Sequence, residues 1–332
     1  MRIGVVGAGT MGAMHASAWK RLGAQVVGIH SSRPEAAAGI ASTVGAALFT
    51  GIAPLLAEID LLDICTPTGS HLHFTRLAAE AGKHVVCEKP ISLTLNEAEA
   101  MIAVCQAAGV RLFIAHVVRF FAQYRAAREA VLRGQIGTLG VLRLKRAAYQ
   151  PQVPKHHWLL DEAQSGGMVT DLMIHDFDYA RWLGGPVERV YAKSARAAWR
   201  DAPGDYALVT LRFASGAMAQ IEGGWAYPPG VFRTALDIAG SEGVIEWHSD
   251  ASATMQSFLE PRRETASAVG LPLSALTEDP YETQLRHVKY AIETNTDFLV
   301  TPQDALEALR IALAARQSLR TGRAVALDEV RE

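Results

Sequence analysis

The stretch Met1-Arg2-Ile3-Gly4-Val5-Val6-Gly7-Ala8-Gly9-Thr10-Met11-Gly12 decides the fold of this 332-residue chain. Residues 3–6 form a short apolar run typical of a buried strand, and residues 11–19 have the composition of a helix. Glycines spaced as G-x-G-x-x-G between a strand and a helix form the phosphate loop of dinucleotide-binding folds. The sequence therefore predicts a dinucleotide site here, with the free N–H groups of the helix facing the pyrophosphate.

The three glycines of this motif differ in what they contribute. Gly7 permits the tight turn after the strand, Gly9 lets the backbone approach a pyrophosphate, and Gly12 lets helix and strand pack closely. Thr10 and Met11 lie between the last two glycines and complete the predicted cofactor loop. The alternative interpretation is a glycine turn with a structural role only.

Composition and charge argue against several classes of protein. The chain has 32 Lys and Arg against 34 Asp and Glu, a formal net charge of -2, which gives no reason to expect nucleic acid or an anionic membrane as a partner. We expect neither a secretory leader nor a membrane span, because the chain opens on a strand and has no run of about 18 apolar residues. Cys65, Cys87 and Cys105 lie in apolar runs without zinc or disulfide spacing. These features favour a cytoplasmic protein.

The end of the second predicted strand bears on the choice of cofactor. This strand covers residues 25–30 and is followed by Ser31, Ser32 and Arg33, with no acidic residue before Glu35. In dinucleotide-binding folds an acidic residue at this place binds the ribose 2′-hydroxyl of NAD, whereas a nearby Arg accommodates the 2′-phosphate of NADP. The sequence favours NADP over NAD, although an ordinary turn before a helix would look similar.

Strands and helices continue to alternate up to about residue 118. The predicted strands are 46–49, 61–65, 84–87 and 110–115, and the predicted helices are 36–44, 72–81 and 95–108. Such alternation indicates βαβ units and a parallel sheet, so residues 1–118 are predicted to form a Rossmann dinucleotide-binding domain. Ligands of these sheets bind beyond the carboxyl ends of the strands. That rule adds five residues to the predicted cofactor site: Thr66, Pro67, His71, Glu88 and Lys89.

The remainder, residues 119–332, has a different rhythm. A helix at 121–132, a strand at 139–149 and a polar, aromatic loop at 150–158 precede a helix at 168–183. The later strands are predicted at 187–195, 206–213, 217–225, 232–239, 243–247 and 254–258, and two helices at 280–293 and 302–321. The sequence predicts an α+β domain with a mostly antiparallel open sheet and helices on one face. The whole chain is therefore assigned to the α/β class.

Two groups of residues carry candidate chemistry. Lys89 follows a strand and would place a positive charge beside a developing alkoxide, although a solvated loop lysine is an equal alternative. Asp171, His175 and Asp178 follow Gly166-Gly167 at helical spacing, so a carboxylate would lie one turn from a histidine base. A surface ion pair or a structural histidine would show the same spacing. A metal site of Asp171 and His175 with His156 or His157 has no motif to fix its ligands, and we predict no metal.

Taken together, these motifs resemble the family named for glucose–fructose oxidoreductase, inositol dehydrogenase and the rhizopine-catabolism protein MocA. The matching residues are Gly7-x-Gly9-x-x-Gly12, Thr66-Pro67-x-x-x-His71, Glu88-Lys89-Pro90 and Gly166-Gly167-x-x-x-Asp171-x-x-x-His175-x-x-Asp178. The resemblance covers about the first half of the chain. It implies a two-domain oxidoreductase that uses NAD or NADP and acts on sugars, inositols or related polyols. It further implies a cis peptide before Pro90 and a dimer or tetramer formed through the sheet of the second domain.

Carried over to this chain, the family's catalytic set is Lys89, Asp171 and His175. His175 would take the hydroxyl proton as the carbon gives up its hydride, Lys89 would stabilise the oxygen, and Asp171 would orient the base. The predicted substrate contacts are these three residues with Arg119, Tyr149, His157 and Trp158. Many family members have Asp where this chain has Ser31, which puts a preference for NAD in doubt.

Two rival functions are compatible with the same fold. One is a cofactor-binding regulator without turnover, which would have no need for a proton acceptor and a lysine together. The other is an enzyme that retains its nicotinamide and passes hydride from one sugar to another. A biliverdin- or dihydrodiol-type reductase is a further variant.

Overall fold

The computed structural model describes residues 1–154, 156–195, 206–250 and 279–330. They form two compact units, Met1–Phe120 with Thr277–Leu306, and Phe121–Leu276 with Glu307–Glu332. The first boundary lies two residues beyond the predicted one. The return of 277–306 to the first unit differs from the predicted single span 119–332. Its reason is packing, since Leu285, Val288 and Phe298 are buried in one core with Trp19.

The first unit is built on a parallel sheet, as predicted. Its strand order is β3-β2-β1-β4-β5-β6, and every neighbouring pair is parallel. The strands are β1 (Arg2–Val6), β2 (Gln25–His30), β3 (Ala47–Phe49), β4 (Leu61–Ile64), β5 (His84–Glu88) and β6 (Leu112–Ala115). Four of them are almost wholly buried, as expected for a sheet with helices on both faces. The order changes direction at β1 and β4, where such sheets bind their ligands.

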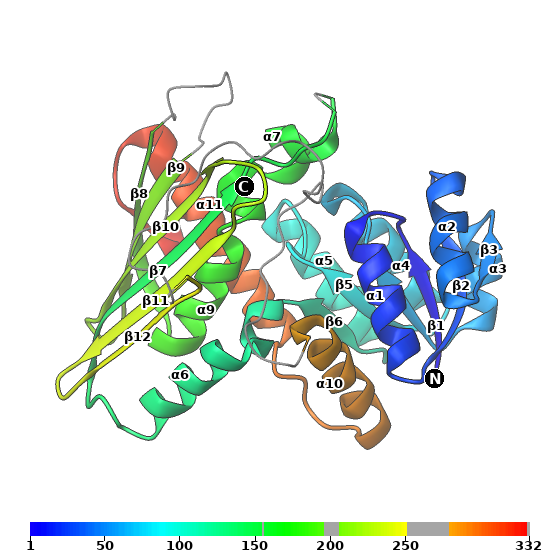
Figure 1. Ribbon diagram of the computed structural model, residues 1–332, viewed down its shortest axis with the longest axis horizontal. Helices are drawn as coiled ribbons and strands as arrows, with labels where there is room; N and C mark the ends of the chain where they lie inside the picture. Colours follow the sequence, from blue (N-terminus) through cyan, green and yellow to red (C-terminus); the bar gives the residue numbers. More distant parts are fainter. Residues whose placement is uncertain (155, 196–205, 251–278, 331–332) are drawn as a thin grey trace. The chain divides into compact units, whose positions relative to one another are not determined.

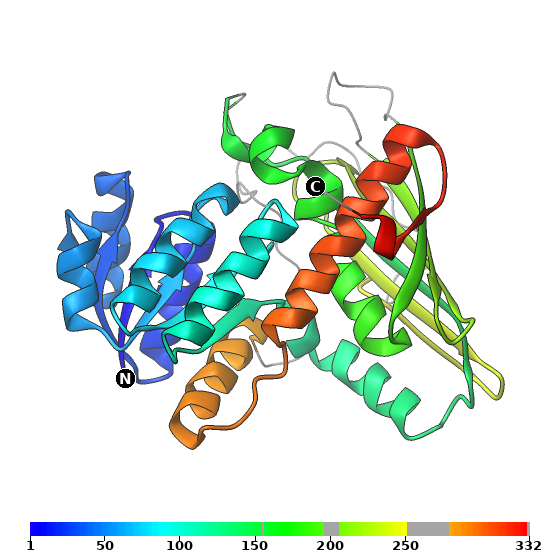
Figure 2. The ribbon, with the colours of Figure 1, turned by 180° about the vertical axis from the view of Figure 1, so that it is seen from behind.

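Helices cover both faces of this sheet. They are α1 (Thr10–Arg21), α2 (Pro34–Val44), α3 (Ile52–Glu58), α4 (His71–Glu80), α5 (Leu95–Ala107) and α10 (Pro280–Thr294), with short 3₁₀ turns η1 (Thr68–Ser70) and η2 (Val117–Phe120). Figure 1 shows α1 and α2 on the near face, and Figure 2, from behind, shows α4 and α5 on the other. Helix α3 was not predicted, because it is only seven residues long and contains Pro54.

The second unit contains a seven-stranded sheet that is mostly antiparallel, as predicted. Its order is β12-β11-β7-β10-β9-β8-β13, and only the pair β7 and β10 is parallel. The strands are β7 (Leu139–Tyr149), β8 (Val187–Ala195), β9 (Tyr206–Phe213), β10 (Met218–Tyr227), β11 (Arg233–Gly240), β12 (Val244–His248) and β13 (Val325–Ala326). The strand predicted at 254–258 lies outside the described residues.

The helices of this unit lie on one face of its sheet, which Figure 2 shows for α9 and α11. They are α6 (Ala122–Leu132), α7 (Glu162–Ser165), α8 (Gly167–Asp171), α9 (Ile174–Gly184) and α11 (Pro302–Thr321, whose first residues belong to the first unit), with η3 (Trp158–Leu160) and η4 (Leu327–Glu329). Along β8 and β9 exposed residues alternate with buried ones, so the opposite face of these strands carries the exposed side chains. No helix among the described residues is long and apolar enough to cross a membrane.

The predicted helix 168–183 is interrupted at Leu172 and Met173. Helix α8 ends there and α9 begins, with the N–H of Met173 reaching the carbonyl of Met168 rather than that of Val169. Met173 is fully buried, and a Cβ at Gly223 of β10 would collide with its side chain. Because Gly223 has no side chain, Met173 can pack against the sheet at this position. Asp171 and His175 consequently lie on two helices rather than on the face of one.

Candidate functional site

The glycine loop joins β1 to α1 at the carboxyl edge of the parallel sheet. Gly7 has a φ of 106°, and a Cβ there would collide with the carbonyl of Cys65. A Cβ at Gly12 would collide with the carbonyl of Gly7. At Gly9, by contrast, a Cβ would meet only the Arg33 guanidinium, at 3.8 Å. Two glycines thus close the turn, and the third keeps an open approach to the backbone.

Helix α1 begins at this open side. Gly9 is its N-cap residue, and its carbonyl accepts the first helical hydrogen bond from the N–H of Ala13. Because glycine has no side chain with which to cap the helix, the preceding N–H groups, including those of Thr10 and Met11, remain available to an anion. A helix N-terminus favours negative charge through its dipole. These residues fit a dinucleotide pyrophosphate.

The end of β2 contacts the same loop. The Arg33 guanidinium donates from Nη2 to the carbonyl of Ala8, over 2.9 Å, and the backbone N–H of Arg33 donates to Ser31 Oγ over 3.1 Å. Ser31 is half-buried, whereas Ser32 and Arg33 are exposed. Glu35 points into solvent from the first turn of α2. A cation and two hydroxyls therefore stand where dinucleotide folds meet the adenosine ribose.

Residues 88–90, which we call the Lys89 turn, follow β5 at the same edge. The Lys89–Pro90 peptide is cis, as the family resemblance implies. His71 is buried beside the turn, with Nδ1 2.9 Å from the carbonyl of Pro90 and Nε2 3.1 Å from the carbonyl of Thr66. Burial lowers the pKa of His71, although the neighbouring carbonyls oppose this, so the ring is neutral and donates through one nitrogen. The Thr66 hydroxyl accepts from Ser70 Oγ at 2.7 Å, and Pro67 is exposed.

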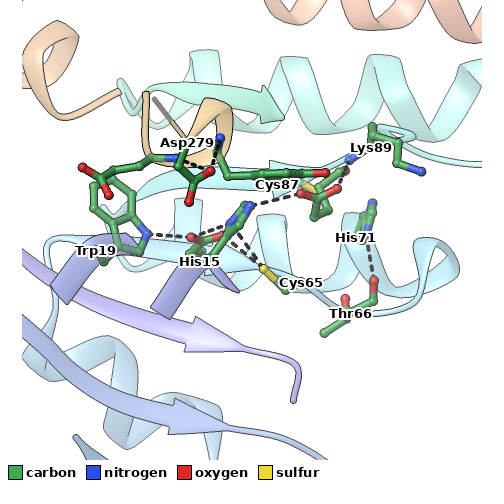
Figure 3. Close-up of polar contacts among 12 residues, drawn as sticks. His15, Trp19, Cys65, Thr66, His71, Cys87, Lys89 and Asp279 are labelled. Atoms are coloured by element: carbon green, nitrogen blue, oxygen red, sulfur yellow. Dashed lines mark hydrogen bonds and ion pairs between the residues drawn. The ribbon is translucent and has the colours of Figure 1, made fainter. Parts of the chain in front are cut away.

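Five side chains form a buried group beneath this edge, which we call the His15 cluster: His15, Trp19, Asp63, Cys65 and Glu88 (Figure 3). His15 Nδ1 lies 3.0 and 3.1 Å from the two oxygens of Asp63, which also accept from the Trp19 indole at 2.6 Å and from the Cys65 thiol at 3.4 Å. His15 Nε2 lies 3.1 Å from Glu88 Oε1, an ion-pair distance whose angles fall outside those of a hydrogen bond.

The charge of His15 follows from these neighbours. Burial by itself lowers the pKa of His15, but Asp63 and Cys65 raise it well above the ordinary value. The attraction therefore exceeds the cost of desolvation, and the imidazolium is the favoured form. Burial and the Asp63 carboxylate raise the pKa of the Cys65 thiol, so this cysteine keeps its proton.

Glu88 and His71, two of the predicted cofactor contacts, have partners within the protein. The carboxylate of Glu88 faces His15 through one oxygen and accepts the backbone N–H of Lys89 through the other, at 3.1 Å. His71 is buried against backbone carbonyls. Both side chains are occupied by protein groups because the turn needs internal partners. Their side chains support the Lys89 turn, and their contact with the cofactor stays a prediction.

Arg119, predicted as a substrate contact, is buried among protein groups. Its side chain is 1% exposed and lies in η2 of the first unit. The guanidinium donates to the carbonyl of Leu299 at 3.0 Å and pairs with Asp304 at 3.2 Å. A buried cation needs such partners, so Arg119 holds residues 299–304 to the first unit.

In the second unit, Asp171 is the last residue of α8 and His175 the second of α9, and both are half-buried. The interruption at Leu172 and Met173 separates them, whereas Asp178, on the same helix as His175, is buried. The pair is therefore presented at a helix junction. Tyr149 is buried at the end of β7, and burial raises its pKa.

A buried ion pair holds α9 on the sheet. Arg146 of β7 donates from its Nε and Nη2 to the two oxygens of Asp176, at 2.6 and 3.0 Å, and both side chains are essentially without exposure. Burial raises the pKa of Asp176, and the Arg146 charge offsets this only in part. We call these two residues the Arg146 pair. Because Asp176 adjoins His175, the pair fixes the start of α9.

His157 and Trp158 lie before and within η3. The N–H of Leu159 donates to His157 Nδ1 at 3.3 Å, and the rings of His157 and Trp158 lie 5.8 Å apart, tilted by 37°. Both side chains are half-buried. An aromatic ring beside a polar one suits a sugar, which has apolar and hydroxylated faces.

The sequence patterns do not predict the His15 cluster or the Arg146 pair. One signal was present, since Asp63 is a charged residue inside an otherwise apolar buried strand, and such a residue requires a partner. The identity of the partners depends on which helix crosses the strand. That is a property of the fold rather than of local sequence.

Comparisons with known proteins cover nearly the whole chain. The family model described as "Oxidoreductase family, NAD-binding Rossmann fold" matches residues 1–116, and the GFO/IDH/MocA C-terminal domain matches residues 124–246. An uncharacterized oxidoreductase of Bacillus subtilis, YrbE, is 33% identical over 82% of this chain and 79% of its own length. Myo-inositol 2-dehydrogenase of Thermotoga maritima is 30% identical over 99% of both chains. The crystal structure of a probable dehydrogenase from Thermotoga maritima matches with a TM-score of 0.85 and 28% identity, covering 100% of both chains.

Proposed function

The chain belongs to the Gfo/Idh/MocA family of oxidoreductases, and we propose from this premise that it transfers hydride between a nicotinamide dinucleotide and a CH–OH group of a sugar, inositol or related polyol. One observation carries the proposal. The glycine loop and the Lys89 turn lie at the same carboxyl edge of the parallel sheet. A cofactor loop and a cationic side chain at one edge suit hydride transfer to or from an oxygen-bearing carbon. Full-length similarity to an inositol dehydrogenase supports the class of substrate.

The proposed catalytic residues are Lys89, Asp171 and His175. A bound nicotinamide dinucleotide would supply the hydride acceptor in one direction and the hydride donor in the other. His175 takes the hydroxyl proton, and the ammonium of Lys89 stabilises the partial negative charge on the oxygen. Asp171 orients the imidazole or binds a neighbouring hydroxyl. In the reverse direction His175 returns the proton to the carbonyl oxygen.

We propose NADP as the preferred cofactor. Arg33 supports this choice, because its guanidinium is held at the glycine loop by the carbonyl of Ala8. Arginine binds phosphate through paired, charge-assisted hydrogen bonds, and the hydroxyls of Ser31 and Ser32 add further donors. Titration with NADPH and NADH tests this assignment. Tighter binding of NADPH, lost in Arg33→Ala, is expected, and a clear preference for NADH would contradict it.

Tyr149, His157 and Trp158 are the proposed substrate contacts of the second unit. Replacing Trp158 by Ala should raise KM more than it lowers kcat, because stacking on a sugar face contributes to binding in the ground state as well. If Trp158→Ala lowers only the melting temperature and leaves KM and kcat unchanged, Trp158 has a packing role instead.

We also propose a cytoplasmic homo-oligomer assembled through the outer face of the second sheet. On this face Tyr191, Leu208 and Met218 are 39%, 48% and 49% exposed, on three neighbouring strands. Large apolar side chains grouped on an open sheet are typical of an interface. Sedimentation should give a dimer or tetramer that Leu208→Glu dissociates, and a monomeric wild-type protein would reject the proposal.

A substrate screen tests the main proposal. The purified protein is assayed with NADP and NAD against a panel of inositols, sugars and anhydrosugars, and turnover is expected with at least one. Lys89→Ala should then lower kcat by about 10²–10³-fold with little change in cofactor affinity. Lys83→Ala, before the opposite end of β5, is the matched control and should be neutral.

The same assay separates the rival functions. A protein that binds dinucleotide but turns over nothing in the panel would favour a regulator. Nicotinamide released only on denaturation, with hydride passed from one sugar to another, would favour a cofactor-retaining oxidoreductase.

A further inference from the structure

We infer that His15 is a positioning residue that ties the glycine-loop helix to the Lys89 turn. Its kinetic consequence rests on the proposed hydride transfer, whereas the tie itself is a matter of structure. His15 lies about one turn beyond Gly12 in α1, so it moves with the loop that receives the cofactor. Through Glu88 it reaches the residue that immediately precedes Lys89.

The contacts form a continuous path from helix to turn. His15 Nδ1 faces Asp63 on β4, which pairs with β1. His15 Nε2 faces Glu88 at the end of β5. The second oxygen of Glu88 accepts the backbone N–H of Lys89. Figure 3 shows this series from α1 across the strand ends to Lys89. A displacement of α1 is therefore passed to the backbone of Lys89 through one imidazole.

The other side of the turn is held independently. His71 reaches the carbonyl of Pro90 and anchors it to the end of β4 near Thr66. Lys89 thus stands between two residues whose positions are fixed by buried histidines. The two histidines differ in charge, because His71 is set among carbonyls and His15 among carboxylates.

The protonation of His15 follows from its geometry. A neutral imidazole has one N–H, whereas an imidazolium has two. His15 Nδ1 is hydrogen-bonded to Asp63, and His15 Nε2 lies at the ion-pair distance of 3.1 Å from Glu88 Oε1, so a carboxylate on each side of the ring favours the imidazolium. Four titratable groups lie around the ring. Asp63 is on β4 and Cys65 directly follows that strand, and Cys87 and Glu88 are the last two residues of β5. Helix α10 packs beside α1, and its N-cap residue Asp279 and its residue Glu282 are both paired with Arg21.

A metal ion is the alternative occupant of this cluster. Ligand atoms of His15, Asp63 and Cys65 lie within 4.8 Å of one another. A cysteine binds metal as the thiolate, however, and burial with the Asp63 charge raises the pKa of this thiol. The Trp19 N–H also donates into Asp63, which already meets part of that carboxylate's demand. A protonated His15 accounts for these contacts better than a bound metal ion does.

Two substitutions separate the two ends of the imidazole. The amide nitrogen of Asn occupies the place of Nδ1, and that of Gln the place of Nε2. His15→Asn therefore keeps a donor toward Asp63 and loses the tie to Glu88, whereas His15→Gln keeps the tie. We expect His15→Asn to lower kcat by about 10²-fold, the cost of a small misplacement, with dinucleotide affinity changed only slightly. His15→Gln should recover most of kcat.

The controls make each outcome decisive. His84→Asn, at the opposite end of β5, should leave kcat unchanged. In a Glu88→Gln background, His15→Asn should add little, because the tie is already broken. Equal losses in His15→Asn and His15→Gln, or a change in thermal stability without a change in kcat, would overturn the inference.

Nitrogen-15 spectra of the wild-type protein test the tie without turnover. Both ring nitrogens of His15 should carry protons at neutral pH, and the backbone amide signal of Lys89 should shift in His15→Asn but not in His15→Gln. A singly protonated ring, or one bound to stoichiometric zinc, would overturn the inference. Absence of turnover in the wild-type protein, with these spectra as expected, would instead reject the proposed function.

Discussion

Two buried ionic groups among the described residues, the His15 cluster and the Arg146 pair, differ in how pairing offsets the cost of burying a charge. In the His15 cluster, burial is the largest single influence and lowers the pKa of His15, but Asp63 and Cys65 together outweigh it, and the pKa rises. In the Arg146 pair, burial outweighs the guanidinium, and the pKa of Asp176 rises. Pairing thus outweighs burial at His15, whereas burial outweighs pairing in its effect on the pKa of Asp176.

This difference matches what each group supports. The Arg146 pair joins a helix to a sheet, and a guanidinium cannot release its proton, so the pair behaves as a fixed anchor. The His15 cluster lies beneath the Lys89 turn and is built around a group that can release its proton. A titratable cluster at a functional edge and a permanent pair beneath a helix should respond differently to the same perturbation.

Asp176→Asn should have the largest effect on stability. It leaves the buried Arg146 charge without its counterion, which costs about 3–5 kcal/mol of unfolding free energy. Urea unfolding measures the loss. The double variant Arg146→Met with Asp176→Leu should return to within about 1 kcal/mol of wild type or exceed it, because buried pairs are often replaced by apolar residues without loss. A double variant as unstable as the single one would show that the pair is net favourable.

Asp63→Asn should cost less, about 1–3 kcal/mol. The chemical change is the same, but His15 can lose its proton when its carboxylate is removed, whereas Arg146 cannot. In Asp63→Asn, the amide oxygen of the new side chain can still accept the hydrogen bond from the Trp19 indole. If Asp63→Asn destabilises the protein as much as Asp176→Asn in parallel unfolding curves, the contrast between the two groups is wrong.

The pH dependence of the unfolding free energy should show a smaller effect, which comes from the His15 cluster. Because the folded pKa of His15 is raised, its contribution is complete below about 6.5, the ordinary histidine value, and is lost as pH rises through the folded pKa. The difference in unfolding free energy between wild type and His15→Gln should therefore shrink above neutral pH. When His15→Gln is introduced into the Arg146→Met, Asp176→Leu variant, the resulting change in unfolding free energy should depend on pH as it does in the wild-type background. A difference that grows with pH would assign His15 the opposite shift.

The smallest effect is expected at an exposed pair. Arg2 and Asp60 lie 2.9 Å apart with side chains 50% and 43% exposed, so Arg2→Gln should cost only about 0.2–1 kcal/mol. Added salt should reduce the difference further, because exposed charges are screened. A loss comparable with that of Asp63→Asn would mean that burial is not what separates these pairs.

The sequence predicts the first unit better than the second for a physical reason. Residues 1–12 combine a strand, a turn and a helix whose roles are local, so the glycine loop and the parallel sheet follow from the pattern. The break at Met173 depends on the absent side chain of Gly223 on a distant strand. Likewise, the burial of Arg119 depends on Asp304, 185 positions away. Local periodicity contains neither contact.

The candidate site divides in the same way. The positions of Lys89 and of the glycines at the sheet edge follow from the rule for strand ends. The contacts of Glu88 and His71 with His15 and with backbone carbonyls come from three separate elements, and only the fold brings these together. The roles of Lys89, Asp171 and His175 remain predictions for kinetics to test.

A double-mutant cycle on kcat/KM for Lys89→Ala and His175→Ala, measured with the substrate found in the screen, tests the proposed hydride transfer most directly. If both side chains act on one oxygen, each single change lowers kcat/KM by about 10²-fold or more, and the double variant is scarcely slower than the worse single one. Losses that multiply, or a His175→Ala protein with wild-type kcat/KM, would contradict a shared role in one hydride-transfer step.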